Sequence, residues 1–204
     1  MSTTVHSPAR RGRPGNDRAD VVAAAVALFN QHGYEATSVG MIAERLGVSK
    51  SAIYHHVASK EELLKQALDR ALNSLEAALM SAQAHNPQTP EEHLQQLETL
   101  IRATVDVLID ELPSATLLLR LRGNTELERA ALDRRRKFDH AVARMVASAA
   151  DAGDLAWRSD TRATTRLVFG MINSIIEWYK PGGSLGPKQL GDLVVAIVFE
   201  GLRH

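Results

Sequence analysis

Residues 38–57 read SVGMIAERLGVSKSAIYHHV, a pattern of two short helices joined by the tight turn Gly47-Val48. In the first helix, apolar residues recur at the helical period and give it one inward side: Ile42, Ala43 and Leu46. Ser49 is suited to cap the second helix, whose inward side carries Ala52, Ile53 and Val57. Because Ala43 is small, the second helix can cross closely over the first. The stretch therefore predicts a helix-turn-helix.

The opposite side of the second helix carries hydrogen-bonding, cationic and aromatic side chains: Lys50, Ser51, Tyr54, His55 and His56. An ordinary solvated face mixes both signs of charge, whereas this one has no carboxylate. Side chains of these types can enter a DNA major groove and bond to base edges. The alternative is a core hairpin, as in some enzymes, whose polar side is only solvated. The missing carboxylates favour contact with double-stranded DNA.

Two flanking segments favour the same interpretation. Residues 1–17 mix Pro and Gly with basic and small polar residues, which is typical of a disordered arm. Within this arm, Arg11 and Arg13 are suited to follow a minor groove. Lys60 begins the next helix, where its own charge and the helix dipole both attract a phosphate.

The composition of the chain limits its class. It has 204 residues, of which 45% are hydrophobic, so it can bury a core. No apolar run approaches the roughly 20 residues that cross a bilayer, and the basic N-terminus lacks the apolar segment of a secretory signal. Cysteine is absent, which excludes disulfides and thiolate zinc ligands. These features favour the cytoplasm and predict no contact with a membrane.

The formal net charge of zero hides an asymmetry. Residues 1–60 carry seven Lys and Arg against four Asp and Glu, whereas residues 61–204 carry seventeen against twenty. A basic head on an acidic body fits a protein that touches nucleic acid at one end.

Nearly every segment of the chain reads as helix, because good helix formers dominate and no stretch alternates as a strand does. We expect an all-α fold of about nine helices: 18–32, 39–46, 50–57, 59–81, 91–110, 114–121, 125–152, 161–179 and 187–202. Ser59 to Glu62 and Thr89 to Glu92 have the spacing of capping boxes. The expected domains are a disordered basic arm (1–17), a helix-turn-helix domain (18–65) and a helical ligand-binding and dimerisation domain (66–204).

Residues 19–68 resemble the DNA-binding domain of the TetR family of repressors. The resemblance is carried by short matches that fall in register: Gly33-Tyr34, Thr37-Ser38, Ile42-Ala43, Gly47-Val48-Ser49, Ile53-Tyr54-His55-His56 and Lys60-Glu61. It implies a homodimer that binds a palindromic operator and is released when a ligand enters the second domain. It also implies two sets of DNA contacts, with Lys50, Ser51, Tyr54 and His55 in the groove and Thr37, Ser38 and Lys60 on phosphates. Gly40 departs from the family pattern and offers no side chain for readout.

The two C-terminal helices predict the dimer interface. Residues 194–199 are apolar all round, and helix 161–179 has apolar positions on two sides. Two such helices, doubled by a two-fold axis, make a four-helix interface. The alternative is that both are core helices of a monomer.

The expected ligand is an aliphatic or acyl compound. Only nine residues are aromatic, too few for an aromatic cage around a cationic drug, and aliphatic residues line the inner helices. Residues 170–185 resemble a TetR subgroup that answers to acyl-CoA thioesters, which makes such a thioester the implied effector. The candidate pocket residues are Ile101, Leu118, Leu121, Arg166, Phe169 and Asn173. Two of these have simpler alternatives, because Asn173 could bond across a dimer interface and Arg166 could be a surface residue.

The remaining signals are weaker. The basic run Arg134 to Lys137 could hold the phosphates of coenzyme A, but a solvated helix face with local pairs to Asp133 and Asp139 is favoured. No cofactor or metal site is expected, since His55 and His56 are adjacent and point apart. A regulator of the same type that senses a lipophilic drug or acts as an activator stays open. An enzyme is a remote alternative, because no phosphate loop or nucleophile motif is present.

Overall fold

A computed structural model describes residues 17–152 and 160–200 of the protein. Within these residues it contains nine helices: α1 (Arg18–His32), α2 (Val39–Leu46), α3 (Lys50–His56), α4 (Lys60–Ala82), α5 (Pro90–Asp110), α6 (Leu112–Leu119), α7 (Glu126–Asp151), α8 (Thr161–Trp178) and α9 (Pro187–Glu200). The predicted all-α class is confirmed. The predicted helix boundaries lie within about two residues of the observed ones, except for the predicted end at residue 202, which lies outside the described residues.

Side-chain caps explain where most helices begin. Ser38, Ser49 and Thr125 each accept a hydrogen bond from the backbone N–H three residues ahead. Thr89 and Glu92 form the predicted capping box. The box predicted at Ser59 forms only in part. Ser59 caps the helix, but the Glu62 carboxylate accepts from the N–H of Ala58 rather than that of Ser59, and it also pairs with Arg18 of α1.

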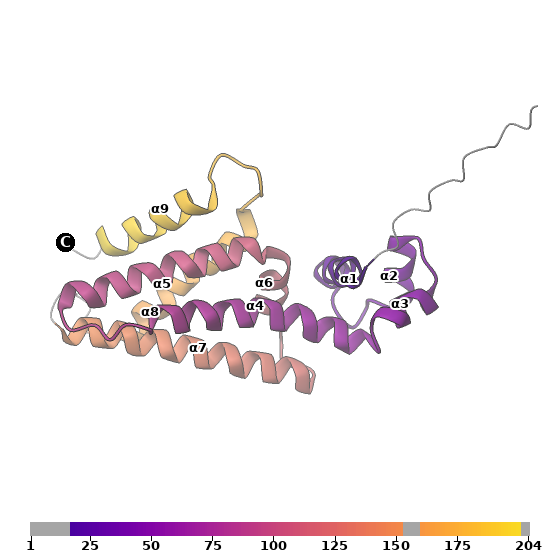
Figure 1. The fold of residues 1–204 in the computed structure, drawn as a ribbon, viewed down its shortest axis with the longest axis horizontal. Coiled ribbons are helices and arrows are strands. Elements are labelled where there is room, and N and C mark those ends of the chain that lie inside the picture. The colour runs from indigo at the N-terminus through magenta and orange to yellow at the C-terminus, as the bar shows by residue number, and fades with distance from the viewer. Residues whose placement is uncertain (1–16, 153–159, 201–204) are drawn as a thin grey trace, which may run out of the picture.

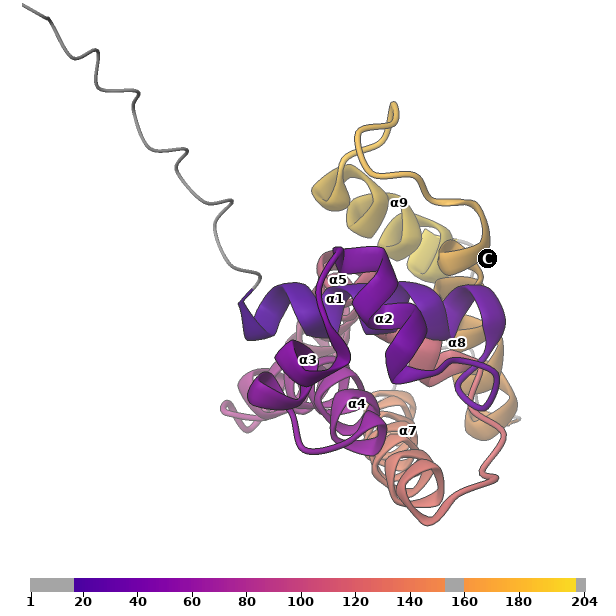
Figure 2. The same ribbon diagram turned by 90° about the vertical axis from the view of Figure 1, so that its right-hand side faces the viewer.

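The helices form a head at one end of the molecule and an elongated body (Figure 1). The head consists of α1, α2 and α3, which face the viewer in Figure 2. α4 leaves the head and continues into the body, where α5 and α7 flank it. Buried side chains of the head core continue along α4 as far as Leu72 and also include Leu117 and Leu118 of α6. The expected domain boundary at residues 65 and 66 therefore falls inside one continuous helix and one hydrophobic cluster.

The body has a second hydrophobic core, which α5, α7, α8 and α9 share. Ile172, Ile175 and Val198 are almost fully buried in it. α9 packs along α5, and Arg102 of α5 pairs with Asp192 of α9 at 2.9 Å. None of the described helices is long and apolar enough to cross a membrane.

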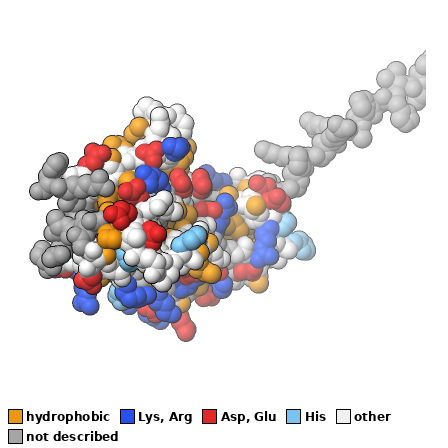
Figure 3. All heavy atoms as spheres, turned by 60° about the vertical axis from the view of Figure 1, so that its left-hand side comes forward, with side chains coloured by type: hydrophobic (Ala, Val, Ile, Leu, Met, Phe, Trp, Pro, Cys, Tyr) orange, Lys and Arg blue, Asp and Glu red, His pale blue; other side chains and the backbone are white. Residues whose placement is uncertain are grey.

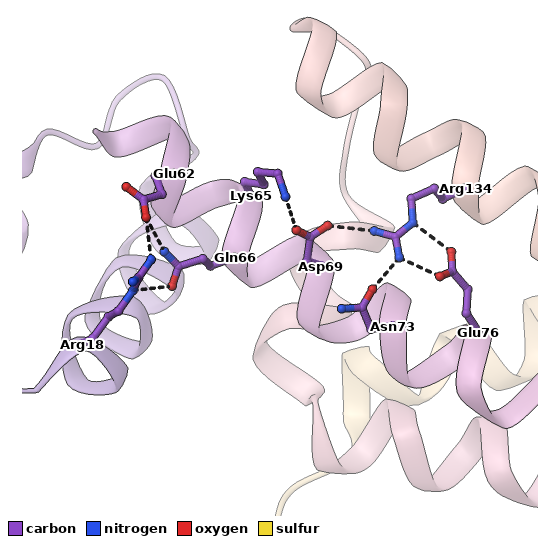
Figure 4. A network of polar contacts seen from close by, with 8 residues as sticks. All are labelled: Arg18, Glu62, Lys65, Gln66, Asp69, Asn73, Glu76 and Arg134. Carbon is purple, nitrogen blue, oxygen red and sulfur yellow. Dashed lines mark hydrogen bonds and ion pairs between the residues drawn. The ribbon is translucent and has the colours of Figure 1, made fainter. Parts of the chain in front are cut away.

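Arg134 ties α7 to α4, contrary to the expectation of a solvated basic run. Its guanidinium donates to both carboxylate oxygens of Glu76 at 2.8 and 2.7 Å, to Asp69 at 2.8 Å and to Asn73 at 2.6 Å (Figure 4). The partner expected for the run at Asp133 is present, since it pairs with Arg136 at 3.1 Å. No ion pair or hydrogen bond joins Asp139 to the run in the described part of the chain. Nothing in the sequence pattern indicates that α4 lies within reach of Arg134.

Candidate DNA-binding face and candidate ligand cavity

The predicted DNA-binding side of α3 faces solvent. Tyr54 is 54% exposed, Lys50, Ser51 and His55 are also exposed, and His56 is half-buried. The opposite side is anchored, because Ile53 and Val57 are buried against Ile42 and Ala43 of α2. These side chains make α3 a rigid support for its polar side. No carboxylate lies on α3, so the face can approach a phosphate backbone without like-charge repulsion.

Gly47 sets the angle between α2 and α3. It adopts a left-handed conformation with φ of 67°, which closes α2, and the next N–H, that of Val48, bonds to the Ala43 carbonyl at 3.0 Å. A side chain with a Cβ is strained in this conformation. The turn Gly47-Val48, which the sequence predicts, therefore sets the direction of α3 relative to α2.

Gly40 leaves room for the Lys50 side chain because it has no Cβ. A Cβ on Gly40 would lie 2.8 Å from Cε and 3.3 Å from Nζ of Lys50. The Lys50 side chain therefore lies across the first turn of α2, where the helix dipole is positive and repels an ammonium group. An anion beside this turn, such as a phosphate, would attract both Lys50 and the free N–H groups of the turn. Ser38 stands at the same turn and is exposed.

Thr37 does not match its expected role as a phosphate contact. Its side chain is buried, with 1% exposed, and its hydroxyl donates to the carbonyls of Gly33 at 2.8 Å and Leu28 at 3.3 Å. These carbonyls belong to the end of α1, which leaves acceptors without helical partners. Thr37 therefore closes α1 rather than reaching DNA.

Lys60 is also used inside the protein. Its Nζ donates to the carbonyl of Tyr34 at 2.9 Å and lies 4.2 Å from the centre of the Tyr34 ring. The ring packs edge-on against Phe29, and burial raises the Tyr34 pKa above 10.0. Lys60 thereby fixes the loop between α1 and α2. A phosphate would accept a hydrogen bond from an N–H of the ammonium group that is not bonded to the Tyr34 carbonyl. The other predicted contacts, Arg11 and Arg13, lie outside the described residues.

The body contains two small apolar pockets that meet at Phe169 of α8. The first has a volume of about 20 Å³ and is lined by aliphatic residues that include Ile101, Val142 and Ile172. The second, of about 40 Å³, is lined by Leu118 among others and carries four polar side chains, those of Thr104, Arg135, Asp139 and Asn173. Each has room for a few water molecules at most, so a larger guest requires the helices to move apart.

A third cavity is a cleft of about 820 Å³ between α7 and α8. Its lining includes five arginines: Arg135, Arg136, Arg144, Arg162 and Arg166. Only Arg136 among them forms an ion pair within the described residues, whereas arginines elsewhere in the body, such as Arg70, Arg102 and Arg134, are paired with carboxylates. In Figure 3, basic side chains gather along the lower edge of the body, the side that α7 occupies in Figure 1. The lining of the cleft therefore carries more cationic than anionic side chains.

The candidate pocket residues fall into three groups. Ile101 lines the first pocket and Leu118 lines the second, whereas Phe169 lines both pockets and the cleft. Asn173 lines the second pocket and the cleft, while Arg166 is exposed in the cleft alone. Leu121 lines none of the three, because α6 ends at Leu119 and Leu121 packs against the head core instead. From the sequence, Arg135 was considered only as part of the basic run that could hold coenzyme A phosphates, and Asp139 was not predicted as a pocket residue.

Comparison with known proteins assigns the family. Residues 21–67 match the model of the bacterial regulatory proteins of the tetR family, and residues 90–202 match the tetracyclin repressor-like C-terminal domain. The chain belongs to the TetR family. It is therefore a helix-turn-helix transcriptional regulator and not an enzyme, as predicted.

Individual TetR proteins resemble the chain over most of its length. The HTH-type transcriptional repressor KstR2 of Mycobacterium tuberculosis is 26% identical over 196 residues, which cover 94% of this chain and 95% of KstR2. The structure of KstR2, a ketosteroid transcriptional regulator, has a TM-score of 0.80 at 25% identity, covering 94% of this chain and 97% of that one. SCO3833 of Streptomyces coelicolor is 46% identical with a TM-score of 0.80, and covers 90% of this chain and 91% of its own.

The TetR fold also occurs in AibR, which has been solved in complex with isovaleryl coenzyme A and operator DNA. AibR is 23% identical to this chain, with a TM-score of 0.71, and the match covers 89% of this chain and 97% of AibR. At that identity the likeness concerns the fold alone. The two TetR models place α2 and α3 of this chain in the DNA-binding part and both apolar pockets largely in the C-terminal part.

Proposed function

We propose that the protein is a ligand-responsive repressor that binds a palindromic operator as a homodimer in the cytoplasm. The observation that carries the DNA contact is the exposed, carboxylate-free side of α3. On it, Lys50, Ser51, Tyr54 and His55 would contact base edges, and Ser38 and Lys60 would contact phosphates. A monomer would contact one half-site only, whereas a dimer places two recognition helices about 34–36 Å apart, one turn of DNA.

Exposed apolar side chains support a dimer through α8 and α9. Seven large hydrophobic side chains are exposed in the described residues, and five of them lie in α8, α9 or their connection: Leu167, Trp178, Leu185, Leu193 and Ile197. Soluble monomers rarely expose such a concentration of apolar surface. A second copy of the same chain would cover it by the symmetry that most oligomers use.

The proposed effector is an acyl-CoA thioester. Coenzyme A carries its phosphates at one end and its acyl group at the other, which matches a cationic cleft that adjoins apolar pockets. The cleft volume of about 820 Å³ lies within the range of small-molecule sites. Arg135, Arg144, Arg162 and Arg166, which form no ion pair within the described residues, would bind the phosphates, and the acyl group would open the pockets at Phe169. A lipophilic cation is disfavoured, because the same arginines would repel it.

The DNA contact is tested with the operator selected from random duplexes by the purified protein. We expect Lys50→Ala combined with Tyr54→Ala to abolish retention of this duplex while the dimer, measured by light scattering, stays intact. A matched control is Lys188→Ala, which removes one exposed cation from α9, far from α3 in the sequence. Unchanged affinity in the double variant would show that the DNA face has been misplaced.

The effector is tested by thermal melting with acyl-CoA thioesters of increasing chain length, free coenzyme A and a lipophilic cation. A binding ligand stabilises the folded state according to its concentration and affinity. We expect thioesters to raise the melting temperature and to release the operator, and we expect the lipophilic cation to do neither. If no thioester shifts the melting temperature, the proposed effector class is wrong. A reporter gene behind the operator then separates a repressor from an activator by the sign of the response.

A further inference from the structure

The two apolar pockets differ in the side chains that line them. The first is lined by aliphatic side chains, two phenylalanines and two threonines. Each threonine hydroxyl donates to a backbone carbonyl of its own helix, at 2.8 Å from Thr104 and 2.7 Å from Thr165. The second pocket carries the side chains of Arg135, Asp139 and Asn173. Of the two pockets, only the first therefore has a lining free of charged groups.

Hydrocarbon and charged side chains make opposite demands on a pocket. A methylene group that leaves water for an apolar lining raises the affinity roughly fourfold. The same group placed against Arg135 and Asp139 removes water from two charges, which is costly. The three polar side chains of the second pocket are better matched to the amide groups of the coenzyme A arm, which lie near the sulfur and both donate and accept hydrogen bonds. The end of a hydrocarbon chain is therefore more stable in the first pocket.

Phe169 and Thr165 stand between the first pocket and the cleft. Thr165 lines both of these cavities, and Phe169 lines the second pocket as well. The half-buried Phe169 ring packs against Phe138 with 5.8 Å between the ring centres. The next position of α8 is open on the side of the cleft, since a Cβ on Gly170 would meet no atom within 4 Å. A chain that starts in the cleft would therefore reach the first pocket by displacing the Phe169 ring.

We propose that the first pocket, behind Phe169, receives the hydrocarbon end of the acyl group, and that its closed volume of about 20 Å³ restricts the effector to short acyl chains. This inference rests on the proposed acyl-CoA function and names the part of the effector that the protein selects. Lengthening the chain gains affinity only while the pocket can open to admit it. Beyond that length, each further carbon would stay in the cleft among water and arginines and would gain nothing.

The test is titration calorimetry on the full-length protein with free coenzyme A and with straight-chain thioesters from acetyl to dodecanoyl. We expect the wild-type affinity to rise roughly fourfold per added carbon and to level off well before dodecanoyl. Phe169→Ala should extend the rise to longer chains, because removing the ring joins the first pocket to the cleft. Phe169→Leu replaces it if the alanine variant does not fold.

A matched pair of variants distinguishes the two pockets. Val168 lines only the first pocket and Val107 only the second, and both side chains are half-buried. Val168→Phe narrows the first pocket and should end the rise at a shorter chain. Val107→Phe makes the same replacement in the second pocket and should leave the length at which the rise ends unchanged. Val168→Leu and Val107→Leu form the replacement pair if either variant does not fold.

The outcomes separate the inference from the proposed function. The inference is overturned if the wild-type rise continues to dodecanoyl, if Val168→Phe keeps the wild-type profile, or if Val107→Phe shortens the rise as much. Each of these results leaves the proposed function intact, because thioesters still bind. If neither free coenzyme A nor any thioester binds to the wild type, the proposed function itself fails, and the inference fails with it.

Discussion

Replacing Arg134 with alanine removes the one side chain that joins α7 to three residues of α4. The guanidinium makes a two-pronged contact with Glu76 and single contacts with Asp69 and Asn73, at 2.6–2.8 Å. An exposed ion pair contributes only about 0.2–1 kcal/mol, but the two-pronged geometry and shared network place this one at the upper end. The side chains of Arg134, Asp69 and Glu76 are 29%, 33% and 41% exposed. The carboxylates can therefore be solvated again, and the larger penalty of a buried unpaired charge does not apply.

We therefore expect Arg134→Ala to lower the free energy of unfolding by about 1–2 kcal/mol, which lowers the melting temperature by roughly 2–8 °C for a chain of this size. Calorimetry or urea unfolding measures the change. The control is Arg136→Ala, which makes the same replacement two residues along α7. Arg136 pairs only with Asp133, at 3.1 Å and with both side chains about 60% exposed, so we expect a loss below about 0.5 kcal/mol. Equal melting of Arg134→Ala and Arg136→Ala would refute the reasoning.

Three further predictions concern separate parts of the molecule. Gly40→Ala should displace Lys50 from the first turn of α2 and weaken operator binding, with melting unchanged or slightly raised; unchanged affinity in a retardation titration would contradict this. Asp139→Asn should stabilise the ligand-free protein near neutral pH, and the gain should vanish as the pH falls below 3.8, because the raised pKa means that folding penalises only the ionised carboxylate. A gain that does not change with pH in calorimetric melts would argue against this cause. Ile197→Glu should give monomers in sedimentation, whereas Met80→Glu, which alters an even more exposed apolar residue on α4, should stay dimeric.

The head could be predicted because its signals are local. Caps at Ser38 and Ser49, the turn at Gly47 and the apolar positions of α2 and α3 are all within 20 residues of one another, and each depends on neighbours in the sequence. The helix boundaries of the body follow from the same kind of signal, as the capping box at Thr89 shows.

The errors arose where the fold supplies a partner that the sequence pattern does not show. Thr37 was expected to contact a phosphate, but its hydroxyl donates to backbone carbonyls at the end of α1. Leu121 was expected in the ligand pocket, but it follows the end of α6 and packs against the head core. Arg134 was expected in solvent, but α4, 58 residues earlier in the chain at Glu76, lies within reach. Side-chain periodicity shows which residues are buried and does not show against what.

The position of Arg134 next to Arg135 would give the proposed effector site a physical route to the DNA-binding head. Successive residues of a helix point about 100° apart, and here Arg134 faces α4 while Arg135 lines the second pocket and the cleft. Opening the two small pockets for an acyl chain requires α7 or α8 to move, and any displacement of α7 at Arg135 also strains the contacts of Arg134 with Asp69. Because α4 enters the head core through Leu63 and Leu64, its displacement moves α3. Allosteric couplings are typically about 1–3 kcal/mol, and the Arg134 contacts are worth a comparable amount, so their loss is sufficient to change operator affinity about tenfold.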